Sequence, residues 1–273
     1  MSTPNLYIRR FMSIQNLKSD AETIQIGSPV NEIKGLNPVV GDDKSKEEKK
    51  TNPVQFYVKF SFSITYIFLL TTATITFIEA MRTNNPTVRH VLNLETAVSL
   101  IASYFYSVFL EKISVFEKED RQIDWRDFTE TRYIDWSMTT PLMLLVLALT
   151  LAQNIGAKVK LHIISAVVAL NFVMLYLGYL GEHGHVDRMI SAVGGFVAFF
   201  GMLYILFVNY VLPKYVFSNY VIFGIFSFVW TFYGILYVLN DVYKNIGMNI
   251  LDLLSKCGFG LALWAYFSKI VTL

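Results

Sequence analysis

Apolar residues gather into seven long stretches from residue 54 onward, and short polar segments separate them. Each stretch is near the ~20 residues that an α-helix needs to cross the hydrocarbon core of a bilayer. Unpaired backbone groups are very unfavourable in lipid, so we expect every stretch to be helical. The pattern predicts an all-α membrane protein, a seven-transmembrane helix bundle, with spans at 55–80, 90–110, 133–152, 161–180, 189–211, 219–239 and 248–267.

The first 53 residues have a different character. They lack a long apolar run, and their eight Lys or Arg nearly balance seven Asp or Glu. Without an apolar run they do not match a cleavable signal peptide, and they bury too little apolar surface to fold alone. We therefore predict a flexible hydrophilic N-terminal tail at 1–53, followed by a seven-transmembrane domain at 54–273.

Composition supports the membrane class and limits the chemistry. The chain is 54% hydrophobic and only 16% charged, whereas soluble domains are about a quarter charged. The single Cys257 excludes a disulfide framework and a cysteine zinc site, and the four histidines form no metal-binding motif. A net charge of +2 gives no sign of nucleic-acid binding. We expect the lipid bilayer and further copies of the chain as partners, and the sequence identifies no transducer.

The loops between the spans differ in charge. One set carries basic residues without acids, namely Arg82, Arg89, Lys158, Lys160 and Lys214. On the opposite side, seven acidic residues lie between the second and third spans, where basic residues occur as well. Because cytoplasmic loops are rich in Lys and Arg, we expect the N-terminus to be extracellular and the C-terminus to be cytoplasmic.

Two ionisable residues lie inside the last span. Lys256 is near its middle, and Asp252 precedes it by four residues, which places both on one helix face. Ionisable residues at mid-bilayer depth are costly and indicate function. A purely structural ion pair is the weaker explanation, since buried pairs rarely stabilise a protein on balance. The pair favours a desolvated lysine that forms an imine beside a carboxylate.

The third span adds a second set of polar residues. Asp135, Thr139, Met143 and Val146 recur at helical spacing on one face, and Arg132 precedes Asp135 by one turn. A single membrane aspartate is often only a hydrogen-bonding partner between helices. Two aspartates, an arginine and a lysine within one small bundle are better explained as a charge cluster.

These motifs resemble those of the microbial rhodopsins. Arg132-Tyr133-x-Asp135-Trp136-x-x-Thr139-Thr140-Pro141-Leu142 is similar to the third helix of bacteriorhodopsin and proteorhodopsin, and Asp252-x-x-x-Lys256 is similar to their last helix. Trp230-Thr231-Phe232-Tyr233-Gly234 resembles the family's Trp-x-x-Tyr-Pro, with glycine in place of proline. The resemblance covers residues 55–270. Asn93-Leu94-Glu95-Thr96 further resembles rhodopsins of giant viruses and marine protists.

The resemblance implies a cofactor and a role for each matching residue. All-trans retinal would bind Lys256 as a protonated Schiff base, with Asp135 as counterion and first proton acceptor and Asp252 completing the counterion. Thr139 would hydrogen-bond Asp135. We expect Arg132, Thr139 and Tyr106 to couple the counterion to the groups around it. We expect five residues to line the retinal pocket: Trp136, Met143, Gly178, Trp230 and Tyr233.

One departure from the family pattern leaves the function open. Pumps of this family usually have a carboxylate at the position of Val146, and valine cannot return a proton. Glu95 in the second span could act as the proton relay, mark an ion path, or lie at the membrane interface. We favour an outward light-driven proton pump over a light-gated cation channel, because channels tend to have a glutamate at the position of Ala102. A sensory photoreceptor is the third alternative, and we expect no enzyme activity.

Overall fold

The computed structural model describes residues 53–271, and this part of the chain is helical throughout apart from its connections. The expected tail at 1–53 lies outside the described residues except for Pro53, which begins the first helix. The described helices are α2 (Pro53–Arg82), α3 (Pro86–Lys118), α4 (Trp125–Asn154), α5 (Leu161–Glu182), α6 (Arg188–Tyr210), α7 (Phe217–Tyr237), α8 (Asp241–Asp252), the π-helical turn η1 (Leu253–Gly258) and α9 (Phe259–Phe267).

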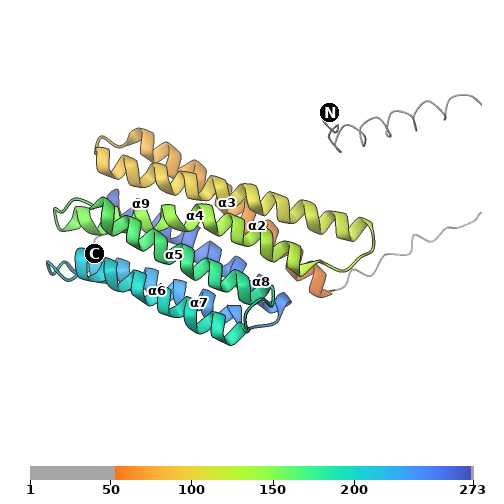
Figure 1. Ribbon diagram of the computed structural model, residues 1–273. Helices are drawn as coiled ribbons and strands as arrows, with labels where there is room; N and C mark the ends of the chain where they lie inside the picture. Colours follow the sequence, from red (N-terminus) through yellow and green to blue (C-terminus); the bar gives the residue numbers. More distant parts are fainter. Residues whose placement is uncertain (1–52, 272–273) are drawn as a thin grey trace, which may run out of the picture. The chain divides into compact units, whose positions relative to one another are not determined.

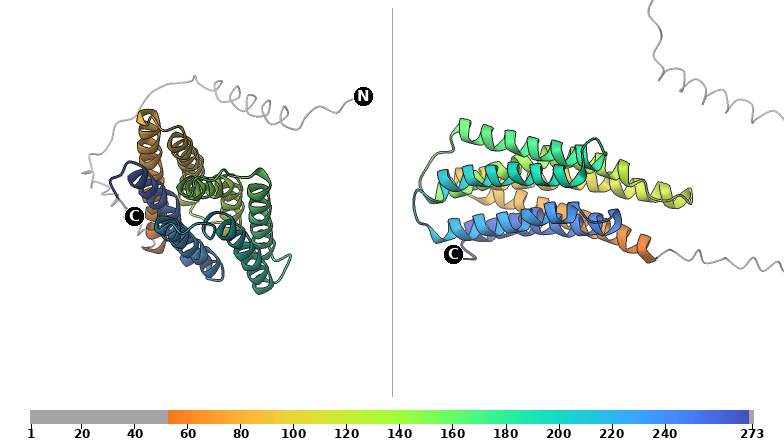
Figure 2. Two further views of the ribbon diagram at one scale, coloured as in Figure 1. Left: turned by 90° about the vertical axis from the view of Figure 1, so that its left-hand side faces the viewer. Right: turned by 60° about the horizontal axis from the view of Figure 1, so that its bottom comes forward.

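The helices form one bundle of seven spans. In the described residues, seven helical segments are long and apolar enough to cross a membrane, and the last of them, Asp241–Phe267, combines α8, η1 and α9. From α2 to α6, each helix packs on the next along the chain, and the last span packs on both α2 and α7, which closes the bundle. Figures 1 and 2 show the spans lying side by side. The predicted fold is confirmed.

The second and third spans are longer than their apolar stretches predict. We expected 90–110 and 133–152, but α3 runs from Pro86 to Lys118 and α4 from Trp125 to Asn154. The added turns contain charged residues that pair across helices. Lys112 Nζ lies 2.6 Å from Asp127 Oδ1, and Lys59 Nζ lies 2.5 Å from Glu117 Oε2. Hydrophobicity identifies the part of a helix that lies in lipid. These ion pairs and residues with high helix propensity extend the helix beyond the lipid.

Polar caps set the start of several helices. Asn85 accepts hydrogen bonds from the backbone N–H groups of Thr87 and Val88, and Pro86 occupies the first helical position. Asp124, Asp187 and Asn240 cap α4, α6 and α8 in the same manner. Because these side chains satisfy otherwise unpaired donors, the connections that precede α3, α4, α6 and α8 each end at a defined residue.

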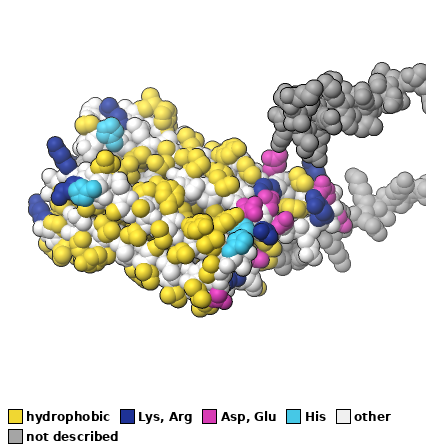
Figure 3. Space-filling model, in the orientation of Figure 1, with side chains coloured by type: hydrophobic (Ala, Val, Ile, Leu, Met, Phe, Trp, Pro, Cys, Tyr) yellow, Lys and Arg dark blue, Asp and Glu magenta, His cyan; other side chains and the backbone are white. Residues whose placement is uncertain are grey.

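The outer surface is apolar between two charged ends. Large side chains such as Phe68, Phe77, Phe200 and Phe228 are exposed on the bundle. On the face drawn in Figure 3, apolar side chains cover the middle, one end carries Lys, Arg and His, and the other end carries acidic groups as well. A soluble protein rarely exposes so large an apolar patch. The chain is therefore an integral multi-pass membrane protein.

Candidate functional site

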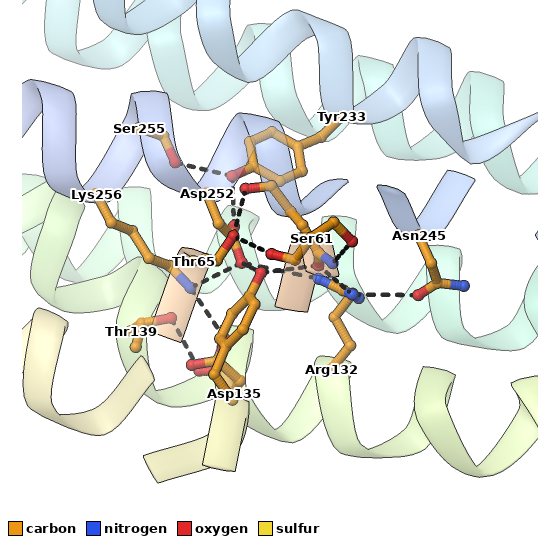
Figure 4. Close-up of polar contacts among 12 residues, drawn as sticks. Ser61, Thr65, Arg132, Asp135, Thr139, Tyr233, Asn245, Asp252, Ser255 and Lys256 are labelled. Atoms are coloured by element: carbon orange, nitrogen blue, oxygen red, sulfur yellow. Dashed lines mark hydrogen bonds and ion pairs between the residues drawn. The ribbon is translucent and has the colours of Figure 1, made fainter. Parts of the chain in front are cut away.

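A buried lysine occupies the middle of the last span. Lys256 lies in η1 and is 1% exposed. Its Nζ atom donates to Asp135 Oδ2 at 2.9 Å, and Asp252 Oδ2 lies 3.4 Å away. Figure 4 shows the lysine reaching from the last span toward Asp135 on α4. The lysine and both carboxylates, which the sequence places in different spans, thus form one cluster.

The two carboxylates differ in their surroundings. Asp252 accepts hydrogen bonds from the Tyr106 hydroxyl at 2.8 Å and from the Tyr233 hydroxyl at 2.6 Å. It also lies 3.7 Å from Nη1 of Arg132. Asp135 accepts from Lys256 on its Oδ2 atom, whereas its Oδ1 atom has no hydrogen-bond donor among the described residues. The negative charge of Asp252 is therefore stabilised by several groups, and that of Asp135 depends chiefly on the lysine.

Thr139 lies beside Asp135, but its hydrogen bond differs from the expected one. The hydroxyl donates to the backbone carbonyl of Asp135 at 2.9 Å rather than to the carboxylate. A threonine inside a helix readily bonds the carbonyl four residues earlier, which explains this choice. Thr139 thus contacts Asp135 as expected, but it bonds the main-chain carbonyl of Asp135 and not its side chain.

Arg132 lies one turn along α4 from Asp135 and is 3% exposed. Its Nη2 atom donates to the side-chain oxygens of Asn245 at 3.1 Å and Asn249 at 2.9 Å. Figure 4 shows the guanidinium on the far side of Asp135 from Lys256. The charge cluster therefore continues from the lysine through the carboxylates to an arginine held by two amides.

An apolar cavity opens next to the lysine. All five residues that we expected around retinal line it, namely Trp136, Met143, Gly178, Trp230 and Tyr233. Sequence reasoning missed further lining residues, including Tyr133, Met174, Phe196 and Phe199. The cavity walls come from four consecutive helices, α4 to α7, and from the last span. Aromatic and aliphatic walls with the amine of Lys256 and the carboxylate of Asp252 at one side suit an extended apolar molecule with a reactive carbonyl.

Gly178 lets Tyr133 approach the cavity wall. A Cβ atom on this glycine would lie 2.5 Å from the Tyr133 hydroxyl oxygen, which is too close for any other residue without movement. The Tyr133 ring in turn packs edge-on against Trp136, with ring centroids 5.4 Å apart. The glycine therefore permits the aromatic packing on one side of the cavity.

The helix that carries the lysine changes form at the site. Residues Leu253–Gly258 form a π-helical turn between α8 and α9. Such turns insert one residue into an α-helix and occur often at functional sites. We predicted one regular helix here, because the apolar pattern does not report a local change in backbone hydrogen bonding.

Glu95 is buried and does not lie at the bundle surface. It is 2% exposed, and a Cβ atom on Gly260 of α9 would lie 2.7 Å from its Oε2 atom. Its side chain makes no hydrogen bond or ion pair within residues 53–271. Val146 is also fully buried, in the apolar core between α4 and its neighbours. Of these two positions, only Glu95 carries a group that can hold a proton.

The asparagines of the last span are functional candidates that sequence reasoning missed. Asn245, Asn249, Asp252 and Lys256 are all buried, and they recur at intervals of four, three and four residues. This spacing places them on one helix face, so the polar stripe was visible in the sequence. We had singled out only its two charged members.

Comparison with known proteins agrees with this geometry. The sequence model of the family described as bacteriorhodopsin-like protein matches residues 56–270. This chain belongs to that family. Microbial rhodopsins bind retinal as their chromophore and are light-driven transporters or sensors. The resemblance to the microbial rhodopsins is thereby confirmed for nearly the whole described part of this rhodopsin.

Solved structures of other rhodopsins share its fold. The viral rhodopsin OLPVRII is 41% identical, with 79% of this chain and 99% of that chain covered and a TM-score of 0.72. A blue light-absorbing proteorhodopsin from Med12 is 24% identical, covers 78% and 98%, and has a TM-score of 0.63. The proton pumping rhodopsin AR2 from the marine alga Acetabularia acetabulum is 22% identical, covers 78% and 96%, and has a TM-score of 0.63. No match was found among the curated proteins.

Proposed function

We propose that this rhodopsin carries all-trans retinal on Lys256 and is a light-driven outward proton pump. The cavity supports the cofactor, because its walls are apolar and aromatic and the buried amine of Lys256 borders it. Bound retinal supplies the absorption of visible light and an isomerisation that changes the environment of the lysine nitrogen. The protein supplies the carboxylates, the arginine and the proton route.

The unequal support of the two carboxylates is the observation that carries this proposal. Asp252 keeps two phenol donors and a nearby guanidinium when the lysine nitrogen loses its proton. Among the described residues, Asp135 then loses the one group that donates to its side chain. A carboxylate with fewer donors and cations around it accepts a proton more readily. Asp135 is therefore the proton acceptor, and Asp252 remains an anion.

The direction of transport follows from what lies on each side of Lys256. Toward the loop between α3 and α4, Arg132 places a fixed cation between Asp135 and the outside. Toward the opposite end, Glu95 places a carboxyl group near the last span. Burying an unpaired carboxylate is costly, so its neutral, proton-carrying form is favoured. Glu95 thus returns a proton to the lysine nitrogen, while Asp135 passes its proton toward Arg132.

Membrane orientation and assembly belong to the same proposal. The loops that carry basic residues without acids face the cytoplasm, so the N-terminus is extracellular and the C-terminus is cytoplasmic. With this orientation, Glu95 lies in the cytoplasmic half and Arg132 in the extracellular half, as outward transport requires. We also propose that the protein assembles into a homo-oligomer in the bilayer.

Light-induced pH change in cells tests the proposed transport. Cells that express the protein and are supplied with retinal should acidify the medium on illumination, and a protonophore should abolish the change. Asp135→Asn should remove the acidification while retinal remains bound. A signal that follows the sodium or potassium gradient instead would show a channel. A visible absorption band without any light-driven ion movement would show a sensor.

A further inference from the structure

One neutral residue joins four helices at the charge cluster. Asn249 lies on α8 and is fully buried. Its side-chain oxygen accepts from Nη2 of Arg132 on α4 at 2.9 Å. It also lies 2.9 Å from the Tyr106 hydroxyl of α3, whose single hydrogen it shares with Asp252. Its Nδ2 atom donates to Ser61 Oγ of α2 at 2.9 Å. Figure 4 shows three of the residues around the charge cluster, Ser61, Arg132 and Asp252.

Arg132 relies on neutral partners more than on the carboxylates. Both of its hydrogen bonds to described residues go to amide oxygens, those of Asn245 and Asn249. Its nearest approach to Asp252 is 3.7 Å, which is an ion pair without a hydrogen bond. Three rings surround the guanidinium carbon, which lies 5.5, 5.2 and 5.9 Å from the ring centroids of Phe62, Phe109 and Trp136.

We propose that Asn249 is a positioning residue that holds Arg132 against the counterion pair. This inference rests on the proposed role of Asp135. Because its anchors are amides and aromatic rings, the guanidinium keeps its place whether Asp135 is charged or protonated. Arg132 then acts on Asp135 as a fixed positive charge, and Asn249 sets how strongly it does so.

A purely structural asparagine would behave differently. If Asn249 only joined α2, α3 and α8, its loss would lower stability and leave the proton affinity of Asp135 unchanged. If it positions Arg132, its loss lets the guanidinium leave the cluster. Asp135 is faced by Lys256, Asp252 and Arg132, with the phenols of Tyr106 and Tyr233 on Asp252. Withdrawing the arginine from this set makes Asp135 easier to protonate.

The test is an acid titration of the visible absorption band of the retinal-loaded protein. Asn249→Leu should move the midpoint pH of the acid red shift upward by about one unit, a tenfold change in proton affinity. In an Arg132→Gln background, the same substitution should move the midpoint no further. Asn249→Ser, which is too short to reach Arg132, should titrate like the leucine variant and serves if that variant does not fold.

Two comparisons separate positioning from general damage. Asn219 is also fully buried, but it bonds the backbone carbonyls of Leu151 and Tyr210 at the other end of the bundle. Asn219→Leu should lower the melting temperature and leave the midpoint in place. In the retinal-free protein, the losses of melting temperature in Asn249→Leu and Arg132→Gln should not add up in the double variant, because the two side chains are directly bonded.

The outcomes are distinct. If the wild-type band shows no acid red shift, the counterion assignment of Asp135 fails. If the wild type shifts and both Asn249 variants titrate like it, only the role of Asn249 fails. An equal midpoint change with and without Arg132 would also overturn the inference, because Asn249 would then act by another route.

Discussion

Removing the carboxyl group of Glu95 should make recovery of the photocycle depend directly on bulk protons. Glu95 packs against Gly260, which follows Lys256 by four residues, about 6 Å along the helix axis. A proton held there is available from inside the bundle rather than from bulk water. Glu95→Gln keeps the size of the side chain and removes that proton.

The magnitude follows from proton supply. Diffusion limits encounters to about 10⁹–10¹⁰ M⁻¹ s⁻¹. At pH 9, bulk protons can then reprotonate the lysine nitrogen no faster than about 1–10 times per second, and at pH 7 about a hundredfold faster. The late photocycle decay of Glu95→Gln should therefore slow about tenfold for each unit of pH, whereas wild type should change far less as long as Glu95 keeps its proton.

Flash photolysis of purified protein between pH 7 and 9 measures this decay. Glu79→Gln is the matched control, since Glu79 pairs with Arg82 near the end of α2 and is partly exposed. The control should decay like wild type. Equal pH dependence in wild type and Glu95→Gln would refute Glu95 as the donor, and a fast decay in both would show that another donor exists.

Four further outcomes follow from the site. Lys256→Ala should abolish the visible absorption band, and a variant that keeps the band would exclude this lysine as the attachment site. Acid should shift the wild-type band to longer wavelength, because protonation of Asp135 removes the anion that stabilises the cationic ground state. Asp135→Asn should show that red-shifted band at neutral pH, and a spectrum equal to wild type would make Asp252 the main counterion. Adding Val146→Asp to Glu95→Gln should accelerate the late decay, as followed by flash photolysis, because the new aspartate places a carboxyl group on α4 in the buried interior of the bundle.

The charged members of the site could be predicted because charge is rare in apolar spans. Lys256, Asp252 and Asp135 stand out against their neighbours, and helical spacing assigns each to an inward face. The 2.9 Å contact between Lys256 and Asp135 could not be predicted from the sequence alone, since the two residues are far apart in the chain. Family resemblance assigned Tyr106 to the surroundings of the counterion, and the structure places its hydroxyl 2.8 Å from Asp252 Oδ2.

The neutral and backbone features were harder to read. Asn245 and Asn249 follow the same polar stripe as Lys256, but asparagine in a span has many roles and does not by itself indicate a charge cluster. The π-helical turn at Leu253–Gly258 is a choice of backbone hydrogen bonding that side-chain periodicity does not encode. The long ends of α3 and α4 depend on ion pairs between helices, such as that of Lys112 with Asp127, which local hydropathy cannot show.

The most direct test of the proposed pump is photocurrent measured against membrane voltage in a cell supplied with retinal. Outward proton transport driven by light predicts an outward current at every accessible voltage, which shrinks at negative potentials without changing sign. The current should persist when sodium and potassium are replaced on both sides. A current that reverses at a voltage set by the cation gradients would contradict the account and identify a light-gated channel.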